Sequence, residues 1–322
     1  MKIVYTSDMS KSKSQEIRKI DIKLLKSNFG RIGEIDKVTI KQSRCKQQRF
    51  AHVLWTEPMF KPMKDIRWHI SNQYELTLLL SAVSLACLKA LGQEVVLYTD
   101  TRGQELLDCL PYDRCYNIFD KFSVNSEFWA AGKIMALQNE PLDSCIIDND
   151  LFLYDGRLID RLSKMNVAAS HQESTSAYVK LIDEGKNIFS HLKGDRNYSA
   201  NTGILKVSDF RLKQMFISAY YSCMRALNNP QLLSDIKAAG NGAYCVDLLC
   251  EQFNYYSICN PEYVINVSDD MTKVNGLTHL LSFEKYVKAP LLLDLLKSLN
   301  SDYYERVLHR WKELDFSIEI EN

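Results

Sequence analysis

Two aspartates lie two positions apart in the segment IIDNDLFLY, at the end of a short apolar run. Asp148 and Asp150 flank Asn149 there. Side chains at this spacing point the same way or diverge around a turn, so both carboxylates can bind one divalent cation. An Asp-x-Asp triplet alone is a weak signal, and a solvated turn is the competing interpretation. Its position after an apolar strand is what favours a metal site.

The chemistry of these ligands narrows the choice of ion. Two adjacent carboxylates repel each other unless a cation or basic groups offset their charge. Mn²⁺ and Mg²⁺ both prefer carboxylate, phosphate and water oxygens. One added imidazole would favour Mn²⁺, and His279 is the candidate for it, with an ordinary loop histidine as the alternative. We therefore predict a Mn²⁺ or Mg²⁺ site formed by Asp148, Asp150 and His279.

The elements that must position these residues alternate between strand and helix. From Arg49 onward, short apolar runs are separated by segments with helical periodicity. The apolar runs are FAHVLWT (50–56), EVVLYTD (94–100), CYNIFD (115–120), SCIIDNDLFLY (144–154), NVAASHQ (166–172) and NTGILKV (201–207). The predicted helices cover about 70–91, a short segment through 106–107, 125–139, 209–227 and 242–257. This order predicts an α/β fold with a mainly parallel sheet and helices on both faces.

Polar side chains follow the predicted strands at the points where the strands end. Thr56 closes the first strand and Asp100 the second, as Asp148 to Asp150 close the fourth. Open α/β sheets bind ligands outside the carboxyl ends of their strands. We therefore expect Thr56 and Asp100 to help bind a ligand beside the aspartates, and the alternative is that they only begin turns.

Composition limits the classes of partner and compartment. Forty basic residues balance forty acidic ones, so no overall field attracts nucleic acid or an anionic membrane. Nine scattered cysteines without zinc spacing indicate reduced thiols and a cytoplasmic protein. The amino terminus lacks the apolar core of a signal peptide, and no segment predicts a membrane span. Residues 1–48 hold twelve Lys and Arg against five Asp and Glu, which predicts an accessory basic segment before one domain at 49–322.

Residues 50–290 resemble glycosyltransferases of the GT-A fold, which is Rossmann-like. The similarity is to the glycogenin-like and lipopolysaccharide-galactosyltransferase-like group, and more so to uncharacterised bacterial relatives. The block WAAGKIMAL (129–137) resembles the helix before the metal-binding strand, which implies that Lys133 lies near the donor. IIDNDLFLY resembles the family's DxD strand, which implies that Asp148 and Asp150 lie at the metal and donor sugar, with Asn149 nearby.

Three further segments extend the resemblance. NTGILKV resembles the strand with the family's N-A-G motif, which implies that Asn201 lies beside the transferred sugar. Glu251 and Gln252 in LLCEQFNYY resemble the acidic residue and glutamine on the acceptor side. His279 and Lys285 in HLLSFEK match a pattern in which the histidine binds metal and the lysine contacts the diphosphate.

The resemblance implies a metal-dependent glycosyltransferase with a nucleoside-diphosphate sugar as donor, UDP being favoured, and a glycan, lipid-linked or protein acceptor. Asn201, Glu251 and Gln252 would act at the reacting sugar, with Glu251 as the base if the enzyme inverts. Structural alternatives are a solvated helix face for Lys133 and capping roles for Asn201 and Glu251. For the whole chain, the alternatives are a non-catalytic scaffold of the same fold and a phosphohydrolase of the haloacid-dehalogenase type, whose DxD lies on the first strand.

Overall fold

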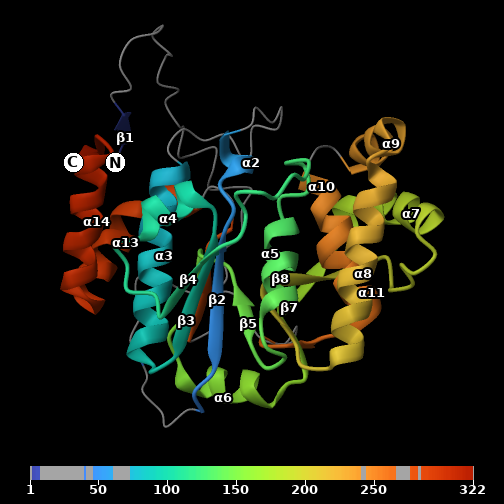
Figure 1. The fold of residues 1–322 in the computed structure, drawn as a ribbon, viewed down its shortest axis with the longest axis horizontal. Coiled ribbons are helices and arrows are strands. Elements are labelled where there is room, and N and C mark those ends of the chain that lie inside the picture. The colour runs from blue at the N-terminus through green and yellow to red at the C-terminus, as the bar shows by residue number, and fades with distance from the viewer. Residues whose placement is uncertain are drawn as a thin grey trace, which may run out of the picture.

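Seven strands form the central sheet, in the spatial order β4-β3-β2-β5-β8-β7-β9 (Figure 1). The computed structural model describes residues 2–7, 40, 46–60, 73–240, 244–265, 276–281 and 284–321. The strands of this sheet are β2 (Arg49–Leu54), β3 (Glu94–Thr99), β4 (Arg114–Asn117), β5 (Cys145–Ile147), β7 (Val167–Ser174), β8 (Tyr198–Val207) and β9 (Glu262–Tyr263). The sheet therefore joins the two halves of the chain.

Strand directions make this sheet mainly parallel. β2, β3, β4 and β5 run in one direction. β8 is antiparallel to both of its neighbours, β5 and β7, while β9 is parallel to β7. The predicted α/β class with a mainly parallel, Rossmann-like sheet is confirmed, whereas the reversed direction of β8 was not predicted. Because β2, β3 and β5 are parallel, their carboxyl ends meet at the same edge of the sheet.

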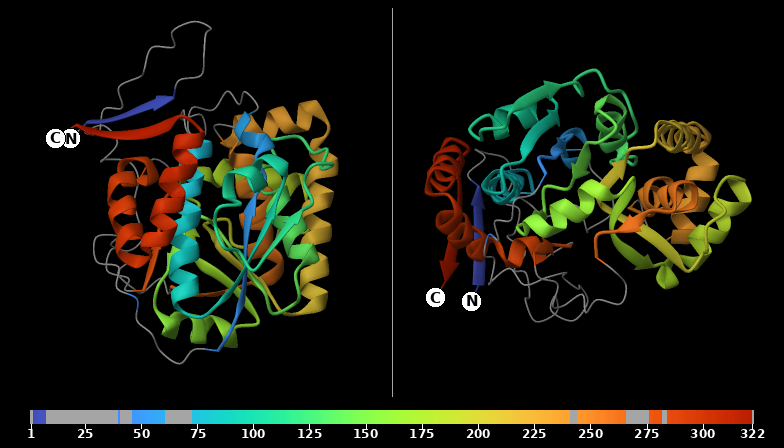
Figure 2. Two further views of the ribbon diagram at one scale, coloured as in Figure 1. Left: turned by 60° about the vertical axis from the view of Figure 1, so that its left-hand side comes forward. Right: turned by 90° about the horizontal axis from the view of Figure 1, so that it is seen from below.

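Helices cover both faces of the sheet, as the two turned views show (Figure 2). The longer helices are α3 (Gln73–Ala90), α5 (Ala131–Asn139), α6 (Gly156–Lys164), α7 (Val179–Ile188), α8 (Phe210–Leu227), α9 (Pro230–Gly240), α13 (Ala289–Leu299) and α14 (Ser301–Glu313). The shorter ones are α2 (Glu57–Phe60), α4 (Thr101–Leu107), the 3₁₀ turn η2 (Ser176–Tyr178), α10 (Tyr244–Asp247), the π-helix η3 (Leu248–Phe253), α11 (Asn254–Cys259) and α12 (Glu284–Val287).

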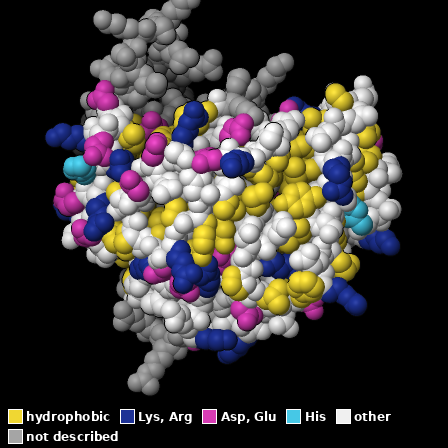
Figure 3. Space-filling model, viewed as in Figure 1, with side chains coloured by type: hydrophobic (Ala, Val, Ile, Leu, Met, Phe, Trp, Pro, Cys, Tyr) yellow, Lys and Arg dark blue, Asp and Glu magenta, His cyan; other side chains and the backbone are white. Residues whose placement is uncertain are grey.

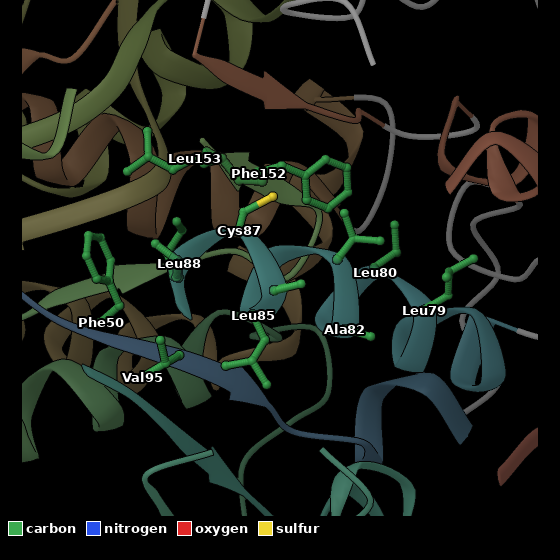
Figure 4. Close-up of a cluster of buried hydrophobic side chains, with 14 of the residues drawn as sticks. Phe50, Leu79, Leu80, Ala82, Leu85, Cys87, Leu88, Val95, Phe152 and Leu153 are labelled. Carbon is green, nitrogen blue, oxygen red and sulfur yellow. The ribbon is translucent and has the colours of Figure 1, made fainter. Parts of the chain in front are cut away.

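Alternate residues of each strand enter two separate cores. Val95 of β3 packs in the core that contains α3, α13 and α14, whereas Val96 packs in the core that contains α5, α8 and η3. Figure 4 shows the side chains of α3 between Phe50 and Val95 of the sheet and Phe152 and Leu153. On the other face, apolar side chains reach the surface around α5, between the sheet and α8 (Figure 3). Because successive side chains of a strand point to opposite faces, the buried strands contribute apolar residues to the cores on both faces of the sheet.

Three predicted elements differ from the structure. The run 144–154 is two strands, β5 and β6 (Leu151–Leu153), because the chain turns after Asp148, whose carbonyl accepts a hydrogen bond from Leu151 N at 3.1 Å. The helix predicted at 125–139 begins only at Ala131, after a series of turns. The helix predicted at 242–257 is interrupted by the π-helix η3. In each case a turn or a change of helix type interrupts an element that the sequence pattern predicted to be continuous.

Two smaller sheets complete the fold. β6 pairs antiparallel with β10 (Leu277–His279). β1 (Lys2–Ser7) pairs antiparallel with β11 (Phe316–Glu321), beside α14 (Figure 2). Apart from 2–7, 40 and 46–48, the predicted accessory segment 1–48 lies outside the described residues. Within the described ranges, no helix has the length and apolar character needed to cross a membrane.

Candidate metal centre

Asp148, Asp150 and His279 come together at the carboxyl end of β5. One ligand atom from each residue lies within 4.8 Å of the others. His279 Nε2 is 3.5 Å from Asp150 Oδ1 and 4.0 Å from Asp148 Oδ2. Two carboxylates and one imidazole with converging atoms are a suitable ligand set for a divalent cation.

The backbone fixes each of these three residues. β10 pairs with β6 so that His279 lies opposite Leu151, directly after the aspartates. Leu280 N donates to the carbonyl of Asp150 at 3.0 Å, and Asp148 N donates to the carbonyl of Gly203 at 2.9 Å. His279 lies on β10, and the two aspartates lie in the short turn between β5 and β6. These backbone hydrogen bonds tie the turn to its neighbours, which favours a preformed site.

Two lysines offset the charge of the aspartates. Lys133 Nζ is 2.8 Å from Asp148 Oδ1, and Lys285 Nζ is 2.7 Å from Asp150 Oδ2. Burial alone would lower the pKa of Lys133, but Asp148 and Glu251 outweigh it and raise that pKa. Burial opposes ionisation of Asp150, yet Lys285 and His279 hold its pKa well below the usual range. Both lysines predicted near the donor thus lie against the metal-ligand candidates.

Glu251 joins the same charged cluster from the π-helix η3. Its Oε1 is 3.0 Å from Lys133 Nζ, and the side chain is 1% exposed. Burial raises the pKa of Glu251, and Lys133 partly opposes that effect. Lys133 also donates to the carbonyl of Thr202 at 3.2 Å. Lys133 of α5 therefore connects Asp148, the strand β8 and the π-helix. Single-turn π-helices occur often at functional sites.

The segment NTG of β8 lines the other side of the centre. Asn201 Oδ1 accepts hydrogen bonds from Gly203 N at 2.9 Å and Ser170 Oγ at 2.5 Å. A Cβ atom on Gly203 would lie 2.6 Å from His279 Cε1. Glycine is required at 203 because the imidazole packs against the backbone there. The Asn-x-Gly spacing therefore places the Asn201 side chain next to the metal-ligand candidates, and it lets the His279 ring pack against the backbone of Gly203.

Glu173 and His171 belong to this cluster and were missed in the sequence. Glu173 Oε1 accepts from Asn201 Nδ2 at 2.6 Å and lies 3.3 Å from His171 Nε2. The rings of His171 and His279 are edge to face, 6.5 Å between centroids. His171 pairs directly with Asn201 across the β7–β8 register. In the sequence, the available signal is a histidine and a glutamate two positions apart at the end of the predicted run 166–172.

Ser170 and Asn201 connect His171 and Glu173 through hydrogen bonds. Ser170 Oγ donates to Asn201 Oδ1 at 2.5 Å and lies 3.0 Å from His171 Nδ1. Burial raises the pKa of Glu173, but the bonds from His171 and Asn201 lower it overall. The hydrogen bonds from His171 and Asn201 thus favour the ionised carboxylate of Glu173.

Three predicted donor-binding residues and Gln252 stand apart from this network. Asp100 Oδ2 accepts from Thr56 N at 2.7 Å and Thr56 Oγ1 at 2.9 Å, and its Oδ1 caps α4 through Gly103 N. Asn149 Oδ1 and Gln252 Oε1 are buried and have no hydrogen-bonding partner within the described ranges. Thr56 and Asp100 thus stabilise the start of α4, while the two buried amide oxygens have unused acceptor capacity among the described residues.

Comparison with known sequences places the chain in a family. A family model matches residues 48–310, which is most of the chain. The chain belongs to DUF6734, a family of unknown function. No curated protein matches the sequence. The range that matches DUF6734 contains every residue of the candidate centre.

The residues of this DUF6734 chain fit a divalent metal ion. His279 Nδ1 is buried without a hydrogen-bonding partner among the residues that the structure covers, and its Nε2 faces both aspartates. No cysteine takes part in the only cluster of metal-ligating side chains found within those residues. An oxygen-rich set with one imidazole suits Mn²⁺ or Mg²⁺ better than a thiolate metal.

Proposed function

We propose that the protein is a metal-dependent glycosyltransferase that moves a sugar from a nucleoside-diphosphate sugar, with UDP favoured, to an acceptor hydroxyl. The single observation that carries this proposal is the convergence of Asp148, Asp150 and His279 with Lys133 and Lys285 at the carboxyl end of β5. Divalent ions and lysines together are what a diphosphate leaving group requires. The resemblance of the same segments to GT-A enzymes supports it independently.

Asp148, Asp150 and His279 would hold Mn²⁺ or Mg²⁺. Such an ion, when bound, neutralises the charge that develops on a diphosphate leaving group. Lys285 lies against Asp150 at 2.7 Å, so its ammonium group is held at the edge of the site and can pair with a phosphate oxygen instead. Lys133 is more enclosed, because Asp148 and Glu251 both bind it. We infer that Lys133 keeps Asp148 oriented while Lys285 binds the donor.

Glu251 and Glu173 take different roles in this proposal. The carboxylate of Glu251 is almost fully buried and paired with Lys133, which is the environment of a positioning residue. The Glu173 side chain is 28% exposed, and His171 and Asn201 both contact its Oε1 atom. The other oxygen, Oε2, can accept a hydrogen bond from a substrate hydroxyl. We therefore assign substrate contact to Glu173, with Asn201 and His171 holding it in place.

The acceptor is a glycan, a lipid-linked saccharide or a protein, and the cytoplasm is the proposed compartment. The alternative functions make separate predictions. A phosphohydrolase releases phosphate from an aryl phosphate, a transferase consumes a nucleotide sugar, and a scaffold of the same fold does neither.

The test is thermal unfolding with a panel of nucleotide sugars, each with and without Mn²⁺. A ligand at one hundred times its Kd stabilises the fold by about 2.7 kcal/mol and raises Tm by several degrees. We expect one nucleotide to raise Tm only with Mn²⁺, and Asp150→Ala to abolish that rise. Asp143→Ala is the matched control, because Asp143 is an exposed carboxylate next to β5. A folded protein whose Tm responds to none of the nucleotides would refute the proposal.

A further inference from the structure

Two buried polar side chains connect the apolar core to the strand that follows the aspartates. His52 lies on β2 and Ser84 on α3, and both are fully buried. Ser84 Oγ donates to the carbonyl of Leu151 at 2.8 Å, and His52 Nε2 lies 3.0 Å from Ser84 Oγ. On the other side of the ring, His52 Nδ1 lies 2.9 Å from Tyr112 Oη. Tyr112, His52 and Ser84 thus form a continuous chain that ends on the first residue of β6.

The carbonyl of Leu151 depends on this chain because of its place in the β6–β10 ladder. Opposite residues of an antiparallel pair alternate between hydrogen-bonded and non-hydrogen-bonded positions. Leu280 N donates to the carbonyl of Asp150, so the next pair, Leu151 and His279, is a non-hydrogen-bonded one. The backbone carbonyl of Leu151 therefore points away from β10. A buried carbonyl needs a donor, and the Ser84 hydroxyl supplies it.

Leu151 is connected to all three metal-ligand candidates. It follows Asp150 directly and lies opposite His279 in the register. Its N–H donates to the carbonyl of Asp148 at 3.1 Å. β6 and β10 have three residues each and, within the described ranges, form a two-stranded sheet of their own. Because isolated two-stranded pairs are marginally stable, a hydrogen bond from the core to β6 is well placed to fix the ligands.

The Ser84 hydroxyl is directed across to β6 rather than back into its own helix. Helical serine and threonine can bond to the carbonyl four residues before them, and Thr77 Oγ1 of α3 does so with Gln73 at 2.7 Å. Ser84 Oγ instead has partners on β2 and β6, and β6 packs over the same helix (Figure 4). Burial lowers the pKa of His52 to about 3, so the ring beside Ser84 is uncharged at neutral pH.

We propose that Ser84 and His52 are positioning residues, which hold Leu151 and thereby keep the aspartate turn in register with His279. His52 fixes the Ser84 hydroxyl, and Ser84 fixes the strand. Without that hydroxyl the Leu151 carbonyl is left buried without its donor, which is costly, so we expect the strand and the turn before it to shift. The inference rests on the metal centre that the proposed function uses, but on no step of sugar transfer.

The experiment is Mn²⁺ titration of the full chain by calorimetry, for the unmodified protein, Ser84→Ala and Ser81→Ala. Ser81 is the matched control, because it is a fully buried serine of the same helix with no hydrogen bond to β6 among the described residues. We expect Ser84→Ala to bind about tenfold more weakly, the lower end for groups that orient metal ligands, and Ser81→Ala to bind like the unmodified protein. Circular dichroism verifies that each variant is folded during the titration. Unchanged affinity in folded Ser84→Ala, or the same loss in both variants, would overturn the proposal.

Two variants of His52 separate positioning from a general loss of core packing. Glutamine places its amide near the position of Nε2, which faces Ser84, whereas asparagine places its amide near Nδ1, which faces Tyr112. We expect His52→Gln to retain most of the Mn²⁺ affinity and His52→Asn to lose about as much as Ser84→Ala. Equal affinities of the two variants, or the reverse order, would exclude the role assigned to His52.

Failure of this inference differs from failure of the proposed function. Mn²⁺ binding that Ser84→Ala leaves unchanged removes the positioning role alone. Weaker Mn²⁺ binding by Ser84→Ala, in a protein that responds to no nucleotide sugar, would support the positioning role and refute sugar transfer. A folded unmodified protein that binds no Mn²⁺ would overturn both, because there would be no metal centre to position.

Discussion

Replacement of Gly203 by alanine tests whether His279 is held in a metal-binding position. The added Cβ would lie 2.6 Å from His279 Cε1 and 3.0 Å from Nδ1, whereas ordinary contacts begin at 3.4 Å. To restore an ordinary contact at Cε1, the His279 ring must move away from residue 203 by about 0.8 Å. Metal–ligand distances tolerate only about 0.2 Å. We therefore expect Gly203→Ala to weaken Mn²⁺ binding by about 10- to 100-fold, as measured by calorimetry.

The fold should survive this substitution. Among the described glycines, a positive φ is found only at Gly92 and Gly276, so the backbone at 203 suits any residue. Gly194→Ala is the matched control, since its Cβ would meet the Tyr256 ring at 2.8 Å, with no ligand candidate among its closest contacts. Wild-type Mn²⁺ affinity in a folded Gly203→Ala protein would refute the assignment of His279 as a ligand.

Three further predictions concern pH, stability and turnover. Burial raises the pKa of Asp247 to about 8, so the folded state retains a proton that the unfolded chain loses near pH 4, and stability should fall between about pH 4 and pH 8. Urea unfolding across that range should show less of this decline for Asp247→Asn, and parallel profiles would contradict it. Arg49→Met leaves Glu140 buried without its 2.8 Å guanidinium partner and should cost about 3–5 kcal/mol, largely recovered by adding Glu140→Gln; urea unfolding of both variants measures this. Glu173→Gln should leave Mn²⁺-dependent UDP affinity nearly unchanged but slow nucleotide-sugar turnover by about 10- to 100-fold, and full turnover would exclude substrate contact.

Apolar patterning predicted most of the sheet because buried strands leave a strong signal. β2, β3 and β8 and the helix α8 lie close to their predicted ranges. The break inside 144–154 was not predicted: the polar triplet 148–150 separates two apolar runs, and periodicity alone does not distinguish a turn there from one continuous strand. What ends β5 is the pairing of Leu151–Leu153 with β10, a partner more than a hundred residues away. Long-range pairing of this kind is invisible to local periodicity.

The candidate site was predictable where residue chemistry alone identifies a role. Asp148, Asp150 and His279 were selected as oxygen and nitrogen ligands, and they do converge. Glu173 was missed because its significance depends on Asn201, which reaches it from the neighbouring strand. Asp100 has the structural role that was the alternative, since a strand-end carboxylate is equally suited to capping the next helix, and it does cap α4.

The π-helix acts as a spacer between two fixed points of one helical segment. On one side Glu251 is bound to Lys133. On the other side, Tyr255 Oη hydrogen-bonds to the carbonyl oxygens of Ala168, at 2.9 Å, and Lys206, at 2.8 Å. These bonds attach α11 to the sheet. Each residue of an α-helix turns by about 100°, so deleting one residue from 248–253 would rotate one attachment point away from its partner. The number of residues in η3, more than their identity, therefore determines where Glu251 points, and alignments of related chains should allow for a single-residue gap there.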